Sequence, residues 1–509
     1  MSQSAPLQPM QGAALWLTAL TLALANFTVV LDITIANVSI PTIAGSLAVA
    51  PSQGTWAVTS YSVAEAISVP LSGWFAARFG VVRWFCVSIA GFALFSLLCG
   101  LSQSLEALVA FRVLQGFSGG PIMPLSQAML QMIFPKEKQG AALGLWASTT
   151  TAAPIFGPIL GGLISDNLSW HWIFFINLPV VALCLTVVWQ RMRGYETPRQ
   201  RLPIDIIGFL LLVIGVGALQ IMLDTGREKD WFGSTEIVVL AIVATLGIIA
   251  FVIWELTEAH PVVDLRIFRH RGFAAATGVI GVGFGCFFSV VVLTPLWLQS
   301  VLGYTATQAG YTVAWIGVFS VLVAPAAGLL LARVDPRITV TFGVAWLGLM
   351  ALWRTSWSTD SDWIHLVWPH LFTGLGMPFF FIGLTSLAMA SVKPEESVSA
   401  AGIMNFVRTL CGAIGAAVAT SQWDTQASRV RSVLAEGMNG VDATMQKMTA
   451  AGLSTEQARA SLSRLLDVQA ATVATVHIYA ATALLFFIAA AAVWIIPKVK
   501  ISGGMGGGH

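Results

Sequence analysis

The stretch that decides the fold runs from Ala13 to Pro41 and reads AALWLTALTLALANFTVVLDITIANVSIP. Its only charged residue is Asp32. A run of roughly 18 or more apolar residues is long enough to cross a bilayer as one helix. A carboxylate inside such a run is unfavourable, so it usually faces a bundle interior or a watery cavity and has a function. Asp32 is therefore a candidate functional residue, the alternative being an acid near a helix end that reaches water.

Composition places the whole chain in the same class as this first run. The 509 residues are 56% hydrophobic and only 10% charged, with a mean hydropathy of +0.80. Soluble domains carry about a quarter charged residues. The five cysteines form no CxxC pair, so neither a metal site nor a disulfide framework is indicated. The net charge of +2 gives no sign of nucleic-acid binding. We expect an all-α polytopic membrane protein whose first apolar run is retained rather than cleaved.

Fourteen apolar runs are long enough to span a membrane. They lie at about 13–40, 53–76, 82–102, 106–132, 140–163, 171–192, 203–224, 234–256, 273–300, 306–331, 337–357, 362–390, 397–423 and 471–496.

Basic residues predict the orientation of these spans, because cytoplasmic connections carry an excess of Lys and Arg. With both ends cytoplasmic, the even-numbered connections and the C-terminal tail hold sixteen of the 26 Lys and Arg residues. These are Arg78, Arg83, Lys136, Lys138, Arg191, Arg193, Arg199, Arg201, Arg266, Arg269, Arg271, Arg333, Arg337, Lys393, Lys498 and Lys500. We therefore expect a multi-pass membrane protein with both ends cytoplasmic.

Segment 424–470 is the long external connection in this topology. It mixes basic and acidic residues with Gln and Ala. Ser454-Thr455-Glu456-Gln457 has the pattern of a capping box, followed by a short amphipathic helix to about Leu466. We expect this segment to offer a docking face.

The two halves of the chain share a pattern. Gly73 is followed five residues later by Arg78, and Gly328 is followed five residues later by Arg333. Weak internal symmetry of this kind is typical of transporters built from repeats. The expected domains are a six-helix bundle at 1–195, an inserted helix pair with linkers at 196–265, and a six-helix bundle at 266–509 that includes 424–470.

Two further charged residues lie inside the apolar runs near Asp32. At the helical rise per residue, Arg112 lies about 10 Å, Asp32 about 12 Å and Glu65 about 18 Å below the outer surface. The three could meet in one cavity. An unpaired guanidinium in hydrocarbon is unfavourable, so Arg112 needs an acid, water or a clamp of backbone carbonyls. Glu65 either lines a substrate path or pairs with a base.

The fifth span ends with an unusual set of small and rigid residues between Ala153 and Gly162. Prolines remove backbone hydrogen bonds and glycines let another helix approach. We expect this helix to bend and to pack closely, although a plain kink remains the alternative. The residues concerned are Pro154, Gly157, Pro158, Gly161 and Gly162.

Other intramembrane polar residues have less specific patterns. Gln115, Asn405 and Arg408 lie in spans four and thirteen, and Arg408 could form a structural pair. His365 and His370 are expected at the outer interface rather than as metal ligands. No HExxH, Walker or GxGxxG pattern is present, so ATP-driven chemistry is not indicated.

Several of these stretches together resemble the major facilitator superfamily, and within it the fourteen-span drug:proton antiporters. The resemblance covers nearly the whole chain, and the gate-loop motif in it includes Gly73, Arg78, Gly80 and Arg83. The stretches are Leu31–Asn37 with Ile40-Pro41, Gly73–Arg83, Arg112–Gly116, Gly157–Gly162 and Trp170–Pro179.

The resemblance implies the major facilitator fold, with two six-helix bundles and two inserted helices. It implies proton-coupled antiport that exports hydrophobic or amphipathic toxic compounds, with protons as the coupling ion and no cofactor. A periplasmic adaptor and an outer-membrane channel would be partners, and the chain would not be an enzyme. Asp32 would be the proton carrier, Arg112 its tuning partner and Glu65 a secondary acid. Two residues depart from the family pattern: Ala77 replaces an acid of the gate loop, and Glu65 replaces a neutral amide.

Three rival functions remain from the sequence. The chain could export one physiological solute, such as a fatty acid or a siderophore. A membrane-embedded transferase would need a catalytic base and a donor site, and neither is evident. A transport-like sensor would need a signalling domain, and no soluble segment is large enough.

Overall fold

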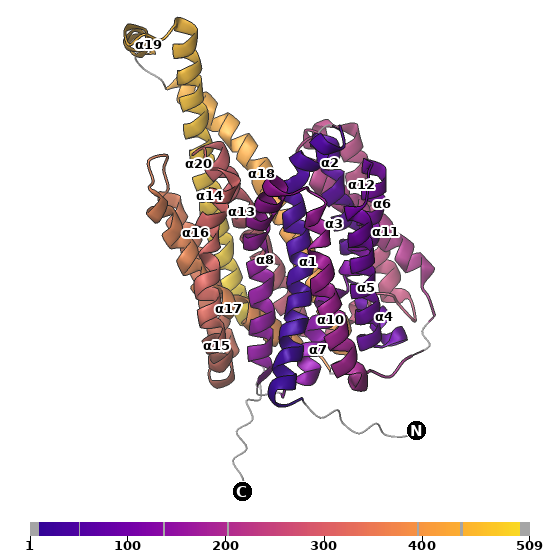
Figure 1. Ribbon diagram of the computed structural model, residues 1–509. Helices are drawn as coiled ribbons and strands as arrows, with labels where there is room; N and C mark the ends of the chain where they lie inside the picture. Colours follow the sequence, from indigo (N-terminus) through magenta and orange to yellow (C-terminus); the bar gives the residue numbers. More distant parts are fainter. Residues whose placement is uncertain are drawn as a thin grey trace.

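Helices make up the chain in the computed structural model, which describes residues 10–49, 51–135, 138–200, 203–393, 396–437 and 441–498. Within these residues no strand occurs, as predicted. Figure 1 shows the long helices running along one common direction, with those of the N-terminal part beside those of the C-terminal part.

We call α1–α10 the N-terminal helices and α13–α20 the C-terminal helices; α11 and α12 lie between them in the sequence. The N-terminal helices are α1 (Gly12–Ser46), α2 (Pro51–Gly54), α3 (Trp56–Ser68), α4 (Ser72–Phe79), α5 (Val81–Gly100), α6 (Leu105–Gly119), α7 (Ile122–Ile133), α8 (Gln139–Asn167), α9 (Trp172–Phe175) and α10 (Asn177–Met192). The others are α11 (Ile206–Thr225), α12 (Thr235–Thr257), α13 (Arg271–Ser300), α14 (Ala306–Ala314), α15 (Ile316–Arg333), α16 (Pro336–Trp353), α17 (Trp363–Met389), α18 (Ser397–Glu436), α19 (Val441–Ala450) and α20 (Thr455–Ala492).

Each of the fourteen predicted spans falls on helix. Within the described residues, 11 helical segments are long and apolar enough to cross a membrane. The predicted runs 53–76 and 106–132 are each divided, between α3 and α4 and between α6 and α7. Pro70 and Pro121 lie at these two breaks, and proline has no backbone N–H to continue the helical ladder.

The segment 424–470 differs from its predicted form as a connection with one short helix. In the structure α18 continues to Glu436 and α20 begins at Thr455, with α19 between them. The end of α18 and the start of α20 protrude together beyond the other helices (Figure 1). Arg431 donates to Asp467 at 2.6 Å and joins the two helices. The capping box at Ser454 and Gln457 is confirmed. The predicted boundaries were placed where hydropathy falls, which shows only where the apolar surface ends. A helix can continue past that point, because polar residues with good helix propensity also form helix.

The N-terminal and C-terminal helices meet along a few helices. The α8 helix packs against α14, α15 and α17, while α18 packs against α4 and α7. The α11 helix contacts both α3 and α18, which places the inserted pair beside the junction. The domain boundaries at 195 and 265 stay a prediction.

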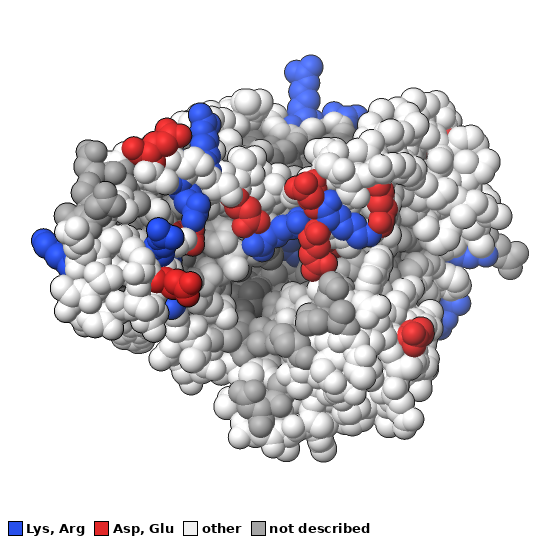
Figure 2. Space-filling model, turned by 90° about the horizontal axis from the view of Figure 1, so that it is seen from above, with Lys and Arg blue, Asp and Glu red and all other residues white. Residues whose placement is uncertain are grey.

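The start of α1 and the end of α20 lie at the same end of the molecule, at the bottom of Figure 1. The Met10 N–H donates to the carbonyl of Ile133 at 3.0 Å, and Lys498 Nζ lies 3.9 Å from Asp335 Oδ2. Figure 2 views the opposite end, where basic and acidic residues are intermixed and the face is hollowed near its centre.

The predicted orientation can be tested with single cysteines at exposed positions. With both chain ends cytoplasmic, Glu456→Cys on α20 faces the outside and Gln200→Cys faces the cytoplasm. We expect a membrane-impermeant maleimide to label Glu456→Cys in intact cells and Gln200→Cys only after permeabilisation. The reverse pattern would reject this topology.

Candidate functional site

Asp32 lies in a buried polar cluster among the N-terminal helices, where only 2% of it is exposed. Its Oδ2 accepts a hydrogen bond from Arg112 Nη1 at 2.5 Å. Its Oδ1 accepts from Asn177 Nδ2 at 2.7 Å and from Gln115 Nε2 at 3.2 Å. Both oxygens of the Asp32 carboxyl group thus accept hydrogen bonds, from one guanidinium and two amides. Helices α1, α6 and α10 therefore meet on one carboxylate.

Besides its bond to Asp32, the Arg112 side chain contacts a backbone carbonyl, an amide side chain and an aromatic ring. Its Nε donates to the carbonyl of Ala57 at 2.7 Å, and Nη1 also donates to Gln115 Oε1 at 3.0 Å. The guanidinium carbon lies 4.2 Å from the centre of the Tyr61 ring. Both predicted alternatives thus occur together, because Arg112 has an acid partner and a backbone clamp. The cation–π contact adds to the stabilisation of this charge.

Close approach of α3 and α6 positions Arg112. A Cβ on Gly116 would lie 2.3 Å from the carbonyl oxygen of Tyr61, so no larger residue fits there. Ser96 on α5 holds Asn177 in place. It accepts a hydrogen bond from Asn177 Nδ2 at 3.0 Å and donates one to the carbonyl of Phe174 at 2.9 Å.

Tyr61 and Asn177 also belong to this cluster, although neither was predicted as a site residue. Asn177 lies inside the Trp170–Pro179 stretch that carries the family resemblance, and its place in that stretch was its only signal.

Glu65 lies near this cluster but is not bonded into it. It is one helical turn from Tyr61 on α3 and 5% exposed. Within the described residues its carboxylate has no hydrogen bond or ion pair. Asp32, Arg112 and Arg408 are the charged groups within electrostatic range of it.

Arg408 and Asn405 lie where the N-terminal and C-terminal helices meet. Asn405 Nδ2 donates to Gln127 Oε1 on α7 at 2.8 Å. The Arg408 guanidinium contacts Met123 Sδ at 2.5 Å and lies about 5 Å from the ring centres of Trp146 and Phe284. No acid forms an ion pair with Arg408 among the described residues. The Arg408 charge is instead surrounded by aromatic and sulfur-containing side chains.

Small residues of α8 bring that helix against α1 beside Asp32. A Cβ on Gly157 would lie 2.1 Å from Thr34 Oγ1, and a Cβ on Gly161 would lie 3.1 Å from the carbonyl oxygen of Ile35. Gly162 faces Thr307 with ordinary spacing, since its Cβ would lie 3.8 Å from Thr307 Oγ1. The helix is continuous through this stretch, and the side chains of Pro154 and Pro158 lie outside the described set.

The gate-loop residues pack at the cytoplasmic end of the predicted topology. A Cβ on Gly73 would lie 2.9 Å from Ser399 Cα on α18, so the two helices nearly touch. Gly80 has a φ of +93°, a conformation that favours glycine. The guanidinium carbon of Arg78 lies 5.5 Å from the centre of the Trp74 ring.

Glu196 supplies an acid to this loop, where Ala77 lacks one. Its carboxylate accepts from the backbone N–H of Val82 at 3.1 Å and of Arg83 at 3.0 Å, and Arg83 Nε lies 3.8 Å from it. The acid that lies beside Arg83 therefore comes from the linker before α11.

Two matched substitutions on α8 test the close contact with α1. Alanine at Gly157 would overlap Thr34 and should lower the free energy of unfolding by about 1–3 kcal/mol. Alanine at Gly162 meets only ordinary contacts and should change it by less than about 1 kcal/mol. Thermal unfolding of the purified variants measures the difference. Equal melting temperatures for Gly157→Ala and Gly162→Ala would contradict the packing described here.

Comparisons with known proteins show the family of the chain. Residues 22–416 match the Major Facilitator Superfamily model. The chain is 41% identical to the multidrug export protein EmrB of Escherichia coli K12 over 99% of each chain. It is 39% identical to the fatty acid resistance protein FarB of Neisseria gonorrhoeae, over 98% of this chain and 99% of that one.

Among solved structures, the human organic anion transporter MFSD10 matches with a TM-score of 0.55 at 14% identity. That match covers 94% of this chain and 100% of the other, and it supports the fold alone. The predicted fold class and the predicted resemblance are both confirmed. The chain belongs to the Major Facilitator Superfamily, in the group that contains EmrB.

Proposed function

We propose that the chain is a proton-driven exporter of hydrophobic and amphipathic toxic compounds in a bacterial inner membrane. The observation that supports it most is the buried carboxylate of Asp32, bonded to Arg112, Gln115 and Asn177. The relatives named as multidrug export proteins support the substrate class.

Asp32 is the proton carrier in this proposal. Burial favours the neutral carboxyl group, whereas the adjacent guanidinium favours the carboxylate, so a change in their separation changes proton affinity. When a proton binds Asp32, the carboxyl group loses its charge and its attraction for Arg112. Arg112 keeps its bond to the Ala57 carbonyl and its contact with Tyr61. The helices that meet on Asp32 then separate more easily, and water that reaches the site from the other side takes the proton away.

The contact between α1 and α8 transmits this change to the junction between the halves. Thr34, two residues after Asp32, donates to the carbonyl of Ala153 at 3.3 Å. Because α8 also packs against three C-terminal helices, a shift of α1 acts on the surface where substrate passes. Glu65 and Arg408 give that surface one acid and one base, so Glu65 acts as a secondary acid that attracts cationic compounds.

The protruding pair formed by α18 and α20 is the docking surface for a periplasmic adaptor, which connects to an outer-membrane channel. It extends past the other helices and carries both signs of charge, including the ion pair of Arg431 and Asp467 (Figure 1). Both chain ends are cytoplasmic in this arrangement.

Export of a fatty acid is the second candidate function. It is favoured by the similarity over nearly the whole chain to a protein named for fatty acid resistance. A shared mechanism of proton exchange would serve either class of substrate.

Asp32→Asn tests the proton carrier. The amide mimics a carboxyl group that never loses its proton, so the variant should still bind substrate but lose uptake driven by a pH gradient in inverted vesicles. Uptake of a fluorescent dye, with and without the gradient, measures the effect.

Glu65→Gln is the matched control on the neighbouring helix. It should keep part of the activity, with the largest loss for cationic compounds. If Asp32→Asn transports at the wild-type rate with unchanged dependence on the gradient, the role assigned to α1 is wrong.

Replacement of 430–465 by a short Gly/Ser linker tests the docking surface. Vesicle transport should remain, because the buried cluster is untouched, whereas resistance of whole cells should be lost. Arg431→Gln in the full-length chain is a milder control that removes one ion pair. Intact cell resistance in the linker variant would exclude the docking role.

A further inference from the structure

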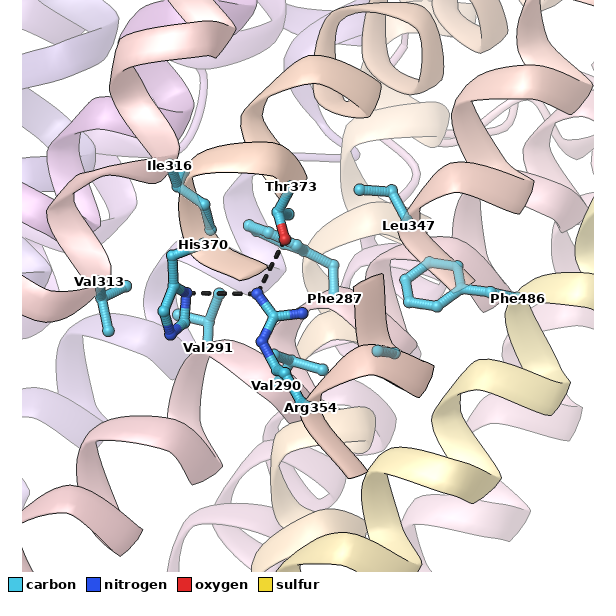
Figure 3. A pocket seen from close by; sticks show the side chains of 11 residues that line it. Phe287, Val290, Val291, Val313, Ile316, Leu347, Arg354, His370, Thr373 and Phe486 are labelled. Carbon is cyan, nitrogen blue, oxygen red and sulfur yellow. Dashed lines mark hydrogen bonds between the residues drawn. The ribbon is translucent and has the colours of Figure 1, made fainter. Parts of the chain in front are cut away.

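A second buried basic cluster lies among the C-terminal helices, at the end of α16 and in the first turns of α17. Arg354 and His370 are each 1% exposed and lie side by side, as Figure 3 shows. His370 was expected at the outer interface, and this expectation is wrong. It lies about 10 Å along α17 from Trp363, at the helical rise per residue, on the face of that helix turned inward.

The hydrogen bonds of this cluster leave several N–H groups without a partner. Arg354 Nη2 donates to His370 Nδ1 at 3.2 Å and to Thr373 Oγ1 at 2.8 Å, the two bonds drawn in Figure 3. A guanidinium only donates, so Nδ1 accepts and the imidazole carries its hydrogen on Nε2. Arg354 Nε and His370 Nε2 are both buried and have no hydrogen-bond partner among the described residues. Buried N–H groups without a protein partner point to a bound water molecule or ion.

The charge of Arg354 separates these two possibilities. No Asp or Glu of the described residues lies within ion-pair distance of it, and the ring of Trp357 is 5.9 Å from its guanidinium carbon. Arg112, which is buried to the same extent, has Asp32 at 2.5 Å. A buried charge without a partner is strongly unfavourable. A water molecule would accept the N–H groups but leave the charge, whereas an anion would accept them and neutralise it.

The space beside the two side chains limits the size of that anion. It leaves about 20 Å³ for the centre of a water molecule, which is room for about one or two waters. Apart from Arg354, His370 and Thr373, the lining side chains are hydrocarbon (Figure 3). A phosphate, a sulfate or an organic acid is too large for this space. A chloride ion is little larger than a water molecule, so size and charge together select a monatomic anion.

We propose that this space holds one chloride ion against the Arg354 guanidinium, with His370 as a second donor. The ion accepts unpartnered N–H groups of the two side chains and supplies the missing counter-charge. It thereby joins the end of α16 to α17 near the outer end of the predicted topology. The site is separate from the Asp32 cluster, so this inference depends neither on proton coupling nor on what the chain exports.

Binding is measured with the full-length chain purified in detergent in sodium gluconate, which is then replaced stepwise by sodium chloride at constant ionic strength. Chloride should raise the melting temperature saturably, because an ion that binds only the folded chain stabilises it. Gluconate should not, because it cannot enter the space. A melting temperature that is unchanged between the two salts, or that rises without saturation, would overturn the proposal.

Arg354→Met removes the charge and the N–H groups but keeps an unbranched side chain. It should weaken chloride binding about tenfold or more, since a bond to a charged group is lost. In gluconate it should melt no lower than the wild type, because a buried charge without a partner has been removed. An arginine with only a structural role would instead lower the melting temperature equally in both salts, which would contradict the site.

Two exposed residues near the outer end provide matched controls. His365→Gln lies five residues before His370 on α17, and Arg459→Gln removes a surface arginine of α20. Both variants should keep the saturable rise with chloride. Loss of the rise in Arg459→Gln would mean that chloride acts at the protein surface, and the proposal would be wrong.

A measurement on the unaltered chain remains available if Arg354→Met does not fold. Bromide has the same charge as chloride, is only slightly larger and scatters X-rays anomalously. Crystals grown with sodium bromide in place of chloride should show an anomalous peak between the Arg354 guanidinium and His370. Density for water at that position without an anomalous peak would overturn the proposal.

Discussion

The ion pair of Asp32 and Arg112, taken out of water, is the constraint around which the N-terminal helices are arranged. Removing one partner of such a pair leaves an uncompensated charge, at a cost of about 3–5 kcal/mol. Most of the other polar atoms of the pair bond to Asn177, Gln115 and the carbonyl of Ala57. Arg112 Nη2 is the exception, because it is buried without a hydrogen-bond partner among the described residues. Close helix contact makes these short bonds possible, and glycine at 116 and 157 allows that contact.

The buried arginines of the molecule differ in how their charge is balanced. Arg112 has a carboxylate, whereas Arg354 and Arg408 have only neutral partners among the residues that the structure describes. A neutralised pair suits a proton carrier, because one proton changes its charge. An unbalanced cation suits the recognition of an anion or an aromatic ring. Under the proposed function, the N-terminal helices therefore carry the group that binds protons.

The gate loop shows how a lost charge is replaced from another part of the chain. Ala77 cannot take part in a charge pair, and Glu196 lies instead at the first N–H groups of α5. A carboxylate at a helix N-terminus is stabilised by the free N–H groups and by the helix dipole. The linker to the inserted helices is thereby bound to the loop between α4 and α5, so the insertion is coupled to the cytoplasmic side of the predicted topology.

The sequence by itself determined the membrane class and the position of each apolar run, and its motifs indicated the family. The depths of Asp32 and Arg112 along their helices allowed the two side chains to meet but did not require it. Class and depth follow from hydropathy and from distance along a helix axis, which are local properties. Only the tertiary structure decided that Asn177 and Tyr61 complete the cluster, that Glu65 stays unbonded and that His370 turns inward to Arg354. A sequence specifies depth in the membrane through helical rise, but lateral neighbours depend on which helices pack and on how each is rotated. The tertiary structure also decided how far α18 and α20 extend, because their polar parts are stabilised by contact with each other, including the ion pair of Arg431 and Asp467.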